Sequence, residues 1–315
     1  MIHSPLDDRD TPIRLSGHET FPLRYGWLKK AYDAVSQGKR SPEEPTVFHD
    51  DDAIARFGVG RNMVSSMRHW ATVAGIISGD GRHVTMMGKQ IFGNGGTDPY
   101  MEDPVTSWFI HWTICSDWRN TTWYWAFSHY PVLIFDRGAL QRGIDKLARE
   151  RPGSRASPST IRNDVACFIR SYVPLPPSER TGYEDSLESP LTELGLIHPV
   201  GLRDGFRFSR GRKPTLGGGM VTFAVLAFWS RHSTAQTLSF EALAHAPGSP
   251  GRVFGLDENT LADYLLEIEE TSGGVCRWSE TAGLKQLIRE RDIDHAEEFA
   301  ILSRDYGRRL RRRAA

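Results

Sequence analysis

The residues best suited to chemistry lie near the start of the chain, in the segment Gly17–Trp27. His18, Glu19 and Arg24 place an imidazole, a carboxylate and a guanidinium close together in sequence. Such a set could activate water and stabilise a pentacovalent phosphate, with Mg²⁺ bound at the Glu19 carboxylate. A structural alternative stays open, in which Glu19 and Arg24 form an ion pair that fastens the N-terminal arm to the first helix.

The elements expected to position this segment are helical. Residues 1–13 have the composition of a loose arm, and Phe21–Val35 carries apolar residues at helical spacing. Three carboxylates at Asp50–Asp52 then precede a short predicted helix, Ala53–Phe57, and the glycines at Gly58–Gly60 predict a turn. A second helix is predicted from Arg61 to Ala74, because its apolar residues recur along one face.

This helix pair is followed by Ile76–Thr85, which has the pattern of a β-hairpin with a basic side. We interpret the segment from Asp50 to Phe92 as a winged helix-turn-helix, a shape that fits against duplex DNA. A winged helix that packs only against other protein is the alternative. On the DNA-binding interpretation, the side chains offered to DNA are Arg61, Asn62, Ser65, Arg68, His69 and Arg82.

The middle of the chain is predicted to be helical throughout, from Asp103 to Val173. Asp103 and Pro104 form a helix start, and further helices are predicted over Arg137–Arg149 and from Ser157 onwards. Five tryptophans crowd the first part of this region, and their apolar neighbours favour a buried core over base stacking: Trp108, Trp112, Trp118, Trp123 and Trp125.

The last third has a strongly apolar predicted helix, Met220–Ser230, preceded by Gly217–Gly219, which we interpret as a flexible joint. Residues 238–278 then suggest a second helix-turn-helix with a wing. The loop between its helices offers backbone N–H groups, the Ser249 hydroxyl and the Arg252 guanidinium, which suit a DNA phosphate. An ordinary tight loop with a surface arginine explains the same residues equally well.

These patterns predict a mainly α protein of the α+β class, with winged helix-turn-helix modules and small β-hairpin wings around a helical bundle. The expected domains are an N-terminal arm plus winged-helix domain (1–96) and a helical domain with a linker (97–180). A C-terminal domain (181–315) follows, which we interpret as a second winged-helix-like module with the basic tail Arg308–Arg313.

Composition restricts where and how such a protein works. The chain has 39 basic and 39 acidic residues, so DNA binding would require that its charges be segregated into patches. The three widely spaced cysteines match neither a disulfide framework nor a zinc site, which favours a reducing cytoplasm. We find no signal-peptide pattern and no apolar run long enough for a bilayer, so no membrane association is expected.

Three blocks of the sequence resemble the SspB-type family, long catalogued as a domain of unknown function. They are Gly17–Lys30, Gly58–Trp70 and Gly248–Phe254, and the resemblance extends from Leu15 to Tyr306. It implies a part in a bacterial system that installs phosphorothioate sulfur in the DNA backbone as an antiphage defence. The implied partners are a cysteine desulfurase, an ATP-pyrophosphatase resembling PAPS reductase, and an ATPase.

The resemblance implies that this component binds double-stranded DNA and nicks one strand, which would open the backbone for sulfur insertion. We therefore expect a DNA-nicking endonuclease whose chemistry centres on Glu19 and His18. The alternatives are a non-catalytic DNA-recognition adaptor and a transcription regulator of the winged-helix type.

Overall fold

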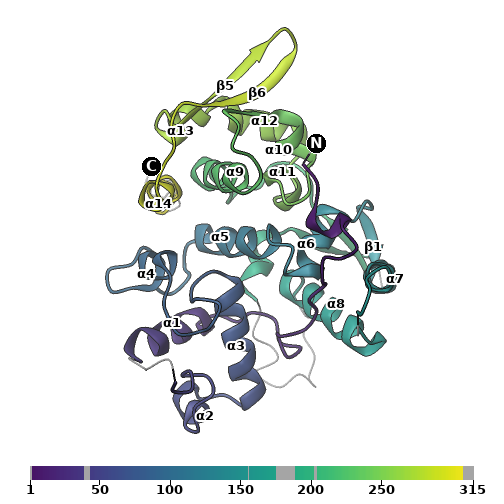
Figure 1. Ribbon diagram of the computed structural model, residues 1–315, viewed down its shortest axis with the longest axis vertical. Coiled ribbons are helices and arrows are strands. Elements are labelled where there is room, and N and C mark those ends of the chain that lie inside the picture. The colour runs from purple at the N-terminus through teal and green to yellow at the C-terminus, as the bar shows by residue number, and fades with distance from the viewer. Residues whose placement is uncertain (1, 39–42, 155, 175–188, 202–203, 308–315) are drawn as a thin grey trace. The chain divides into compact units, whose positions relative to one another are not determined.

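The computed structural model describes residues 2–38, 43–154, 156–174, 189–201 and 204–307 of the 315-residue chain (Figure 1). The chain forms two compact units, each assembled from separate stretches of sequence. Unit 1 consists of Met1–Thr11, Asp103–Leu133 and Phe208–Ala315, and unit 2 of Pro12–Glu102 and Ile134–Arg207. The division into three consecutive domains stays a prediction. The described residues do not include the predicted boundary at 180, the linker before it or the basic tail.

Unit 2 begins with four helices and ends with a small α+β module. Its elements in chain order are α1 (Trp27–Gln37), α2 (Ala53–Phe57), α3 (Arg61–Val73), α4 (Met86–Phe92), β1 (Ile134–Asp136), α7 (Arg137–Arg149), α8 (Pro158–Tyr172), the 3₁₀ helix η3 (Pro190–Leu194), β2 (Ile197–Val200) and β3 (Gly205–Phe208). The helix predicted from Phe21 begins instead at Trp27, because Gly26 adopts a left-handed conformation (φ 78°) as its N-cap.

Helices α2 and α3 form where the sequence predicts them. Gly58 ends α2 with a left-handed φ of 67°, and Gly60 is the N-cap of α3. The buried face of α3 includes Val64, Met67 and Trp70. The predicted wing is not a regular hairpin: one antiparallel β-bridge joins Ile77 to Val84, and the unpredicted helix α4 follows directly.

The second part of unit 2 contains a strand where the sequence predicts only helix. Strand β1 pairs antiparallel with β3, which lies in the middle of a three-stranded sheet of order β1-β3-β2. Helix α7 has Asp136 as its N-cap, and α8 has Ser157, whose side chain accepts a hydrogen bond from the Thr160 amide. The bounds predicted for α7 and the start predicted for α8 are therefore confirmed.

Unit 1 consists mainly of helices, several of which have buried aromatic side chains, and it contains a second small sheet. Its elements are η1 (Pro5–Asp7), α5 (Pro104–Cys115), α6 (Thr121–Ser128), α9 (Gly218–His232), β4 (Thr237–Ser239), α10 (Phe240–His245), α11 (Pro250–Val253), α12 (Glu258–Leu266), α13 (Ile268–Ser272), β5 (Cys276–Thr281), β6 (Leu284–Arg289) and α14 (His295–Ser303). Trp108, Trp112 and Trp123 are buried, which confirms the core interpretation for these three tryptophans.

The two sheets share one topology. Each has a strand, then helices, then a hairpin whose last strand pairs with both others, giving the orders β1-β3-β2 and β4-β6-β5. In unit 1 the β5–β6 hairpin projects from the helices that precede it (Figure 1). The protein is therefore of mixed α+β class, with two similar modules in different units.

The glycines at Gly217–Gly219 are not a flexible joint, as the sequence suggests, but a close-packed helix start. The Asp305 carboxylate, 3% exposed, accepts a hydrogen bond from the Met220 amide (2.7 Å) in the first turn of α9. A Cβ at Gly217 would overlap that carboxylate, and one at Gly219 would lie 2.6 Å from the Ile301 carbonyl oxygen.

We expect Gly217→Ala and Gly219→Ala each to lower the free energy of unfolding by about 1–3 kcal/mol, because backbone or a buried carboxylate would have to move. Gly218→Ala is the matched control. Its Cβ would meet only the Thr271 methyl, at 3.2 Å, and alanine favours the helix, so the free energy should hardly change. Urea denaturation of the three variants measures this, and equal losses in all three would contradict the explanation.

Two further expectations from composition can be compared with the structure. Cys115, Cys167 and Cys276 are all buried and free, and burial raises the pKa of the Cys167 and Cys276 thiols. They therefore behave as small core side chains. In the part of the chain that the structure describes, no helix combines the length and apolar character needed to cross a bilayer.

Candidate functional site

The loop Ser16–Thr20 has the most unusual backbone of unit 2. Ser16, Gly17, Glu19 and Thr20 have φ values of 65°, 92°, 48° and 67°. For a residue with a Cβ, this left-handed conformation costs about 1–2 kcal/mol. Such conformations persist only where the surrounding structure holds them, and they cluster at functional sites. The loop is therefore our candidate functional site.

A buried carboxylate from a distant helix holds this loop. His18 and Asp164 of α8 are 1% and 2% exposed, and the His18 Nε2 atom lies 2.8 Å from Asp164 Oδ1. The same oxygen accepts the Ser16 amide at 2.6 Å, and the Thr20 amide donates to His18 Nδ1 at 3.1 Å. Since Nδ1 accepts, the imidazole proton is on Nε2 and points at Asp164.

Helix α3 also supports the loop. The Trp70 indole N–H donates to the Phe21 carbonyl at 2.9 Å, directly after the loop. The His69 ring meets the His18 ring edge-on at a centroid distance of 6.0 Å, and a Cβ at Gly17 would lie 2.8 Å from His69 Nδ1. Glycine is therefore required at position 17 by both its φ and this close approach.

The electrostatics of the loop favour a neutral imidazole at position 69. The pKa of His69 is lowered to about 4, chiefly by burial and also by the neighbouring His18, while Asp164 opposes the shift. At neutral pH His69 is therefore uncharged. His69 is half-buried and packs against Gly17, and its part in DNA contact stays a prediction.

The three predicted catalytic residues differ in accessibility. His18 is buried, and Arg24 is 3% exposed with its guanidinium over the rings of Phe21 and Trp27, at 5.5 and 5.4 Å. Glu19 is exposed, and its carboxylate has no ionic or hydrogen-bonding partner within the described residues. The ion pair considered between Glu19 and Arg24 is therefore not formed there, and of the three only Glu19 is open to a ligand from solution.

The predicted DNA contacts of α3 and of the predicted wing divide into exposed side chains and side chains bonded within the protein. Arg61, Asn62 and Ser65 are exposed. Arg68 is half-buried and donates to the Asp80 carbonyl at 3.4 Å, and Arg82 donates to the Glu44 carbonyl at 2.8 Å. The N-terminal half of α3 thus offers the polar face that DNA binding requires.

The predicted phosphate site in unit 1 is not supported. Ser249 is fully buried, and its hydroxyl accepts the Arg252 amide as the N-cap of α11. The Gly248 amide donates to Ser128 Oγ at 2.8 Å, and Arg252 Nε donates to the His245 carbonyl at 3.3 Å. The Ser249 hydroxyl and the Gly248 amide are therefore used inside the protein, and a phosphate could not reach Ser249, whereas the half-buried Arg252 stays a predicted contact.

Comparison with known proteins places the chain in a family. A family model described as "Protein of unknown function (DUF4007)" matches residues 15–306. Two SspB crystal structures, one of them magnesium ion-bound, resemble this structure with TM-scores of 0.80 and 0.79. Both are 28% identical in sequence, and the match covers 96% of this chain and 90% of theirs. The chain belongs to the SspB-type family. No curated protein matches it.

The metal prediction for this SspB-type protein concerns Glu19 alone. Among the described residues, no group of three or more histidine, cysteine, aspartate or glutamate side chains could hold a metal ion. Mg²⁺ usually keeps several waters and is held by one or two carboxylates plus substrate phosphates. The exposed Glu19 carboxylate fits that mode of binding and does not fit a preformed protein cage, so the Mg²⁺ site stays a prediction.

Sequence reasoning missed Asp164, although a signal for it exists. Asp164 lies three residues after Ile161 and four before Phe168, on the buried face of α8. A carboxylate within an apolar stripe requires a partner. What no local pattern could indicate is that the partner is His18, which precedes it by 146 positions.

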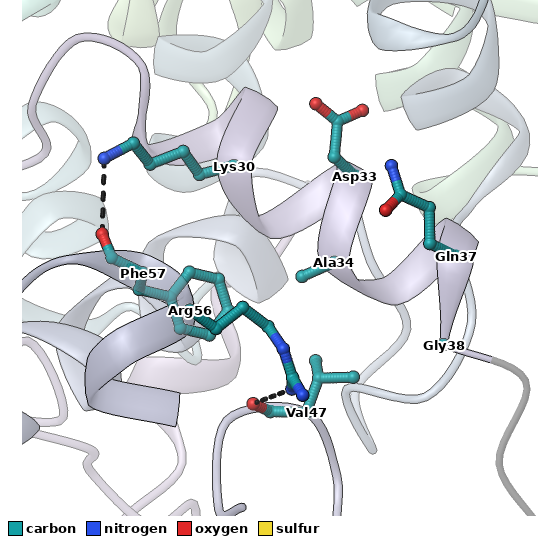
Figure 2. Close-up of a pocket in the computed structure, with 8 residues that line it drawn as sticks. All are labelled: Lys30, Asp33, Ala34, Gln37, Gly38, Val47, Arg56 and Phe57. Atoms are coloured by element: carbon teal, nitrogen blue, oxygen red, sulfur yellow. Dashed lines mark hydrogen bonds between the residues drawn. The ribbon is translucent and has the colours of Figure 1, made fainter. Parts of the chain in front are cut away.

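A separate pocket of about 400 Å³ lies in unit 2 and shares no residue with the Ser16–Thr20 loop (Figure 2). Its lining residues are Lys30, Asp33, Ala34, Gln37, Gly38, Val47, Arg56 and Phe57. The Lys30 and Arg56 cations donate to the carbonyls of Phe57 and Val47, at 3.3 and 3.2 Å. Both cationic side chains therefore line the pocket and bond to backbone carbonyls of other lining residues.

Proposed function

We propose that this protein binds duplex DNA and nicks one strand, as a component of a DNA phosphorothioate modification and phage-defence system. Membership of the SspB-type family supports the system. One observation supports the proposed nicking activity. The Ser16–Thr20 loop, most of whose residues have positive φ values and which is held by His18 and Asp164, presents the exposed Glu19 carboxylate next to helix α3.

DNA binding by α3 is supported by its position and its exposed side chains. It is the second helix of a pair joined by a glycine turn, as in a helix-turn-helix, where the N-terminal residues of the second helix contact base edges. Arg61 and Asn62 are side-chain types that bind guanine and adenine edges in the major groove. We therefore propose that this segment is a winged helix-turn-helix with a rudimentary wing.

For the chemistry, Glu19 would hold Mg²⁺ together with phosphate oxygens and water. The ion would supply positive charge at the phosphate and lower the pKa of a bound water. In the reaction, a water oxygen bonds to phosphorus while one bond from phosphorus to a sugar oxygen breaks, giving a phosphate monoester and a free hydroxyl. His18 and Arg24 are buried, so we assign them to positioning the loop.

A non-catalytic role is the second candidate, and one observation favours it. Within the described residues Glu19 is not part of any cluster of possible metal ligands, whereas many nucleases use two metal ions. In this case the protein would recognise DNA and present it to a cysteine desulfurase, a PAPS-reductase-like ATP-pyrophosphatase and an ATPase. A winged-helix transcription regulator would bind DNA in the same way but would need no such partners.

Nicking of supercoiled plasmid with Mg²⁺ tests the proposal. We expect Glu19→Gln to lower the nicking rate by about 10²-fold or more, because the metal-binding carboxylate is lost. Glu150→Gln, another exposed glutamate of unit 2, is the matched control and should nick normally. Undiminished nicking by Glu19→Gln would remove Glu19 from the mechanism, and DNA binding without nicking by the wild-type protein would favour a non-catalytic role.

A further inference from the structure

The charges of this chain are segregated between its two similar modules. Residues 137–172, which include α7 and α8, carry eight basic and three acidic side chains, a formal charge of +5 in a chain with no net charge. The helices between the strands of the second module, residues 240–272, carry seven acidic side chains and one basic one, a formal charge of −6. Only the α7–α8 module therefore has the charge that attracts a polyanion.

The solvent face of α8 carries side chains of the kinds that bind nucleic acid. Ser159, Arg162 and Asn163 are exposed and lie on one face, at positions i, i+3 and i+4. Neither Arg162 nor Asn163 has a hydrogen-bonding or ionic partner among the residues described. Asp164, the acidic residue of this helix, is buried against His18, so it does not neutralise this face.

Both α8 and α3 contact the segment from Ser16 to Phe21, through different residues. From α8, Asp164 binds His18 and the Ser16 amide, and Arg170 donates to the Thr20 carbonyl at 3.4 Å. From α3, Trp70 binds the Phe21 carbonyl. The loop that presents Glu19 is thus held by two helices, and both have an exposed arginine–asparagine pair in their N-terminal halves.

We propose that α8 is a second DNA-contacting helix, in which Arg162 binds a backbone phosphate while α3 also contacts the duplex. This inference rests on the proposed DNA-binding function and extends it. One helix alone would hold the DNA at a single place near Glu19. Contacts from both helices would fix a phosphate at the loop itself, which is what cleavage at a defined position requires.

The test measures affinity of the full-length protein for a labelled DNA duplex at a series of salt concentrations. We expect Arg162→Ala to weaken binding by about fivefold or more. It should also reduce the slope of log affinity against log salt by about 1, because one phosphate contact is lost. Arg61→Ala is the parallel variant in α3, and Arg119→Ala, an exposed arginine of unit 1 paired with Asp117, is the matched control.

The outcomes separate this inference from the function on which it rests. If wild type binds DNA and Arg61→Ala binds less tightly, but Arg162→Ala behaves like Arg119→Ala, the role of α8 is wrong and the proposed function stands. If the wild-type protein does not bind DNA at any salt concentration, the proposed function fails and the inference fails with it. Comparable thermal unfolding of Arg162→Ala and wild type shows that the variant is folded.

Discussion

Replacing Asp164 with alanine is expected to lower the free energy of unfolding by about 3–5 kcal/mol. The substitution leaves the His18 Nε2–H and the Ser16 amide without their acceptor, and His18 is 1% exposed, so water cannot replace it there. It also removes the group that holds three left-handed residues in place, Ser16, Glu19 and Thr20. Urea denaturation followed by tryptophan fluorescence measures the loss.

Asp164→Asn is the matched control, because the hydrogen bonds from His18 and from the Ser16 amide end on the same oxygen, Oδ1. An asparagine carbonyl oxygen can occupy that position and accept both donors without a negative charge. We expect the asparagine variant to lose less than half as much stability as the alanine variant. A loss under about 1 kcal/mol in Asp164→Ala would mean that other contacts hold the loop.

The helices that the sequence predicts well are those whose ends have a local chemical cause. Asp103 before Pro104, and Ser157 before Pro158, are N-caps followed by a proline at the first helical position, and both helices start there. Gly58 and Gly60 fix the turn between α2 and α3 in the same way. Each of these signals is contained within a few residues, so it can be recognised without the fold.

The candidate site could not be predicted in the same way, because its geometry depends on contacts between distant residues. The sequence identifies His18 and Glu19 as candidates for chemistry, but their accessibility is set by α3 and by Asp164, which is far away in the chain. Strand β1 was missed for a related reason: it has three residues, and its hydrogen-bonding partner, β3, is about seventy residues later. The local sequence around His18 or around β1 does not indicate the distant residues with which each of them pairs.

The same limit applies to the predicted phosphate site in unit 1. Gly248–Arg252 has the residue types of an anion-binding loop, but these types also form a buried helix cap. The structure distinguishes the two by showing where the donors point: the Gly248 amide bonds Ser128, which lies 120 positions earlier. Residue type alone therefore overestimates binding sites wherever a polar loop is buried.

Acidification should destabilise unit 1 well before its carboxylates are protonated, because His111 of α5 is fully buried. Its Nε2–H donates to the Val253 carbonyl at 2.8 Å. The pKa of His111 is lowered from 6.5 to about 4, chiefly by burial and also by Lys213, while the Val253 hydrogen bond opposes the shift. The unfolded chain therefore takes up a proton between pH 6.5 and 4 that the folded protein cannot accept.

Stability should thus be fully present above about pH 6.5 and fall as the pH approaches 4, by about 3 kcal/mol from His111 alone. The measurement is the free energy of unfolding in urea at several pH values, followed by tryptophan fluorescence, since the Trp108 ring lies edge-on to His111 at 5.9 Å. His111→Phe should be less stable at neutral pH, because Val253 loses its donor, but should lose less stability on acidification. An unchanged pH dependence in that variant would show that other groups, with His69 the first candidate, take up the proton instead.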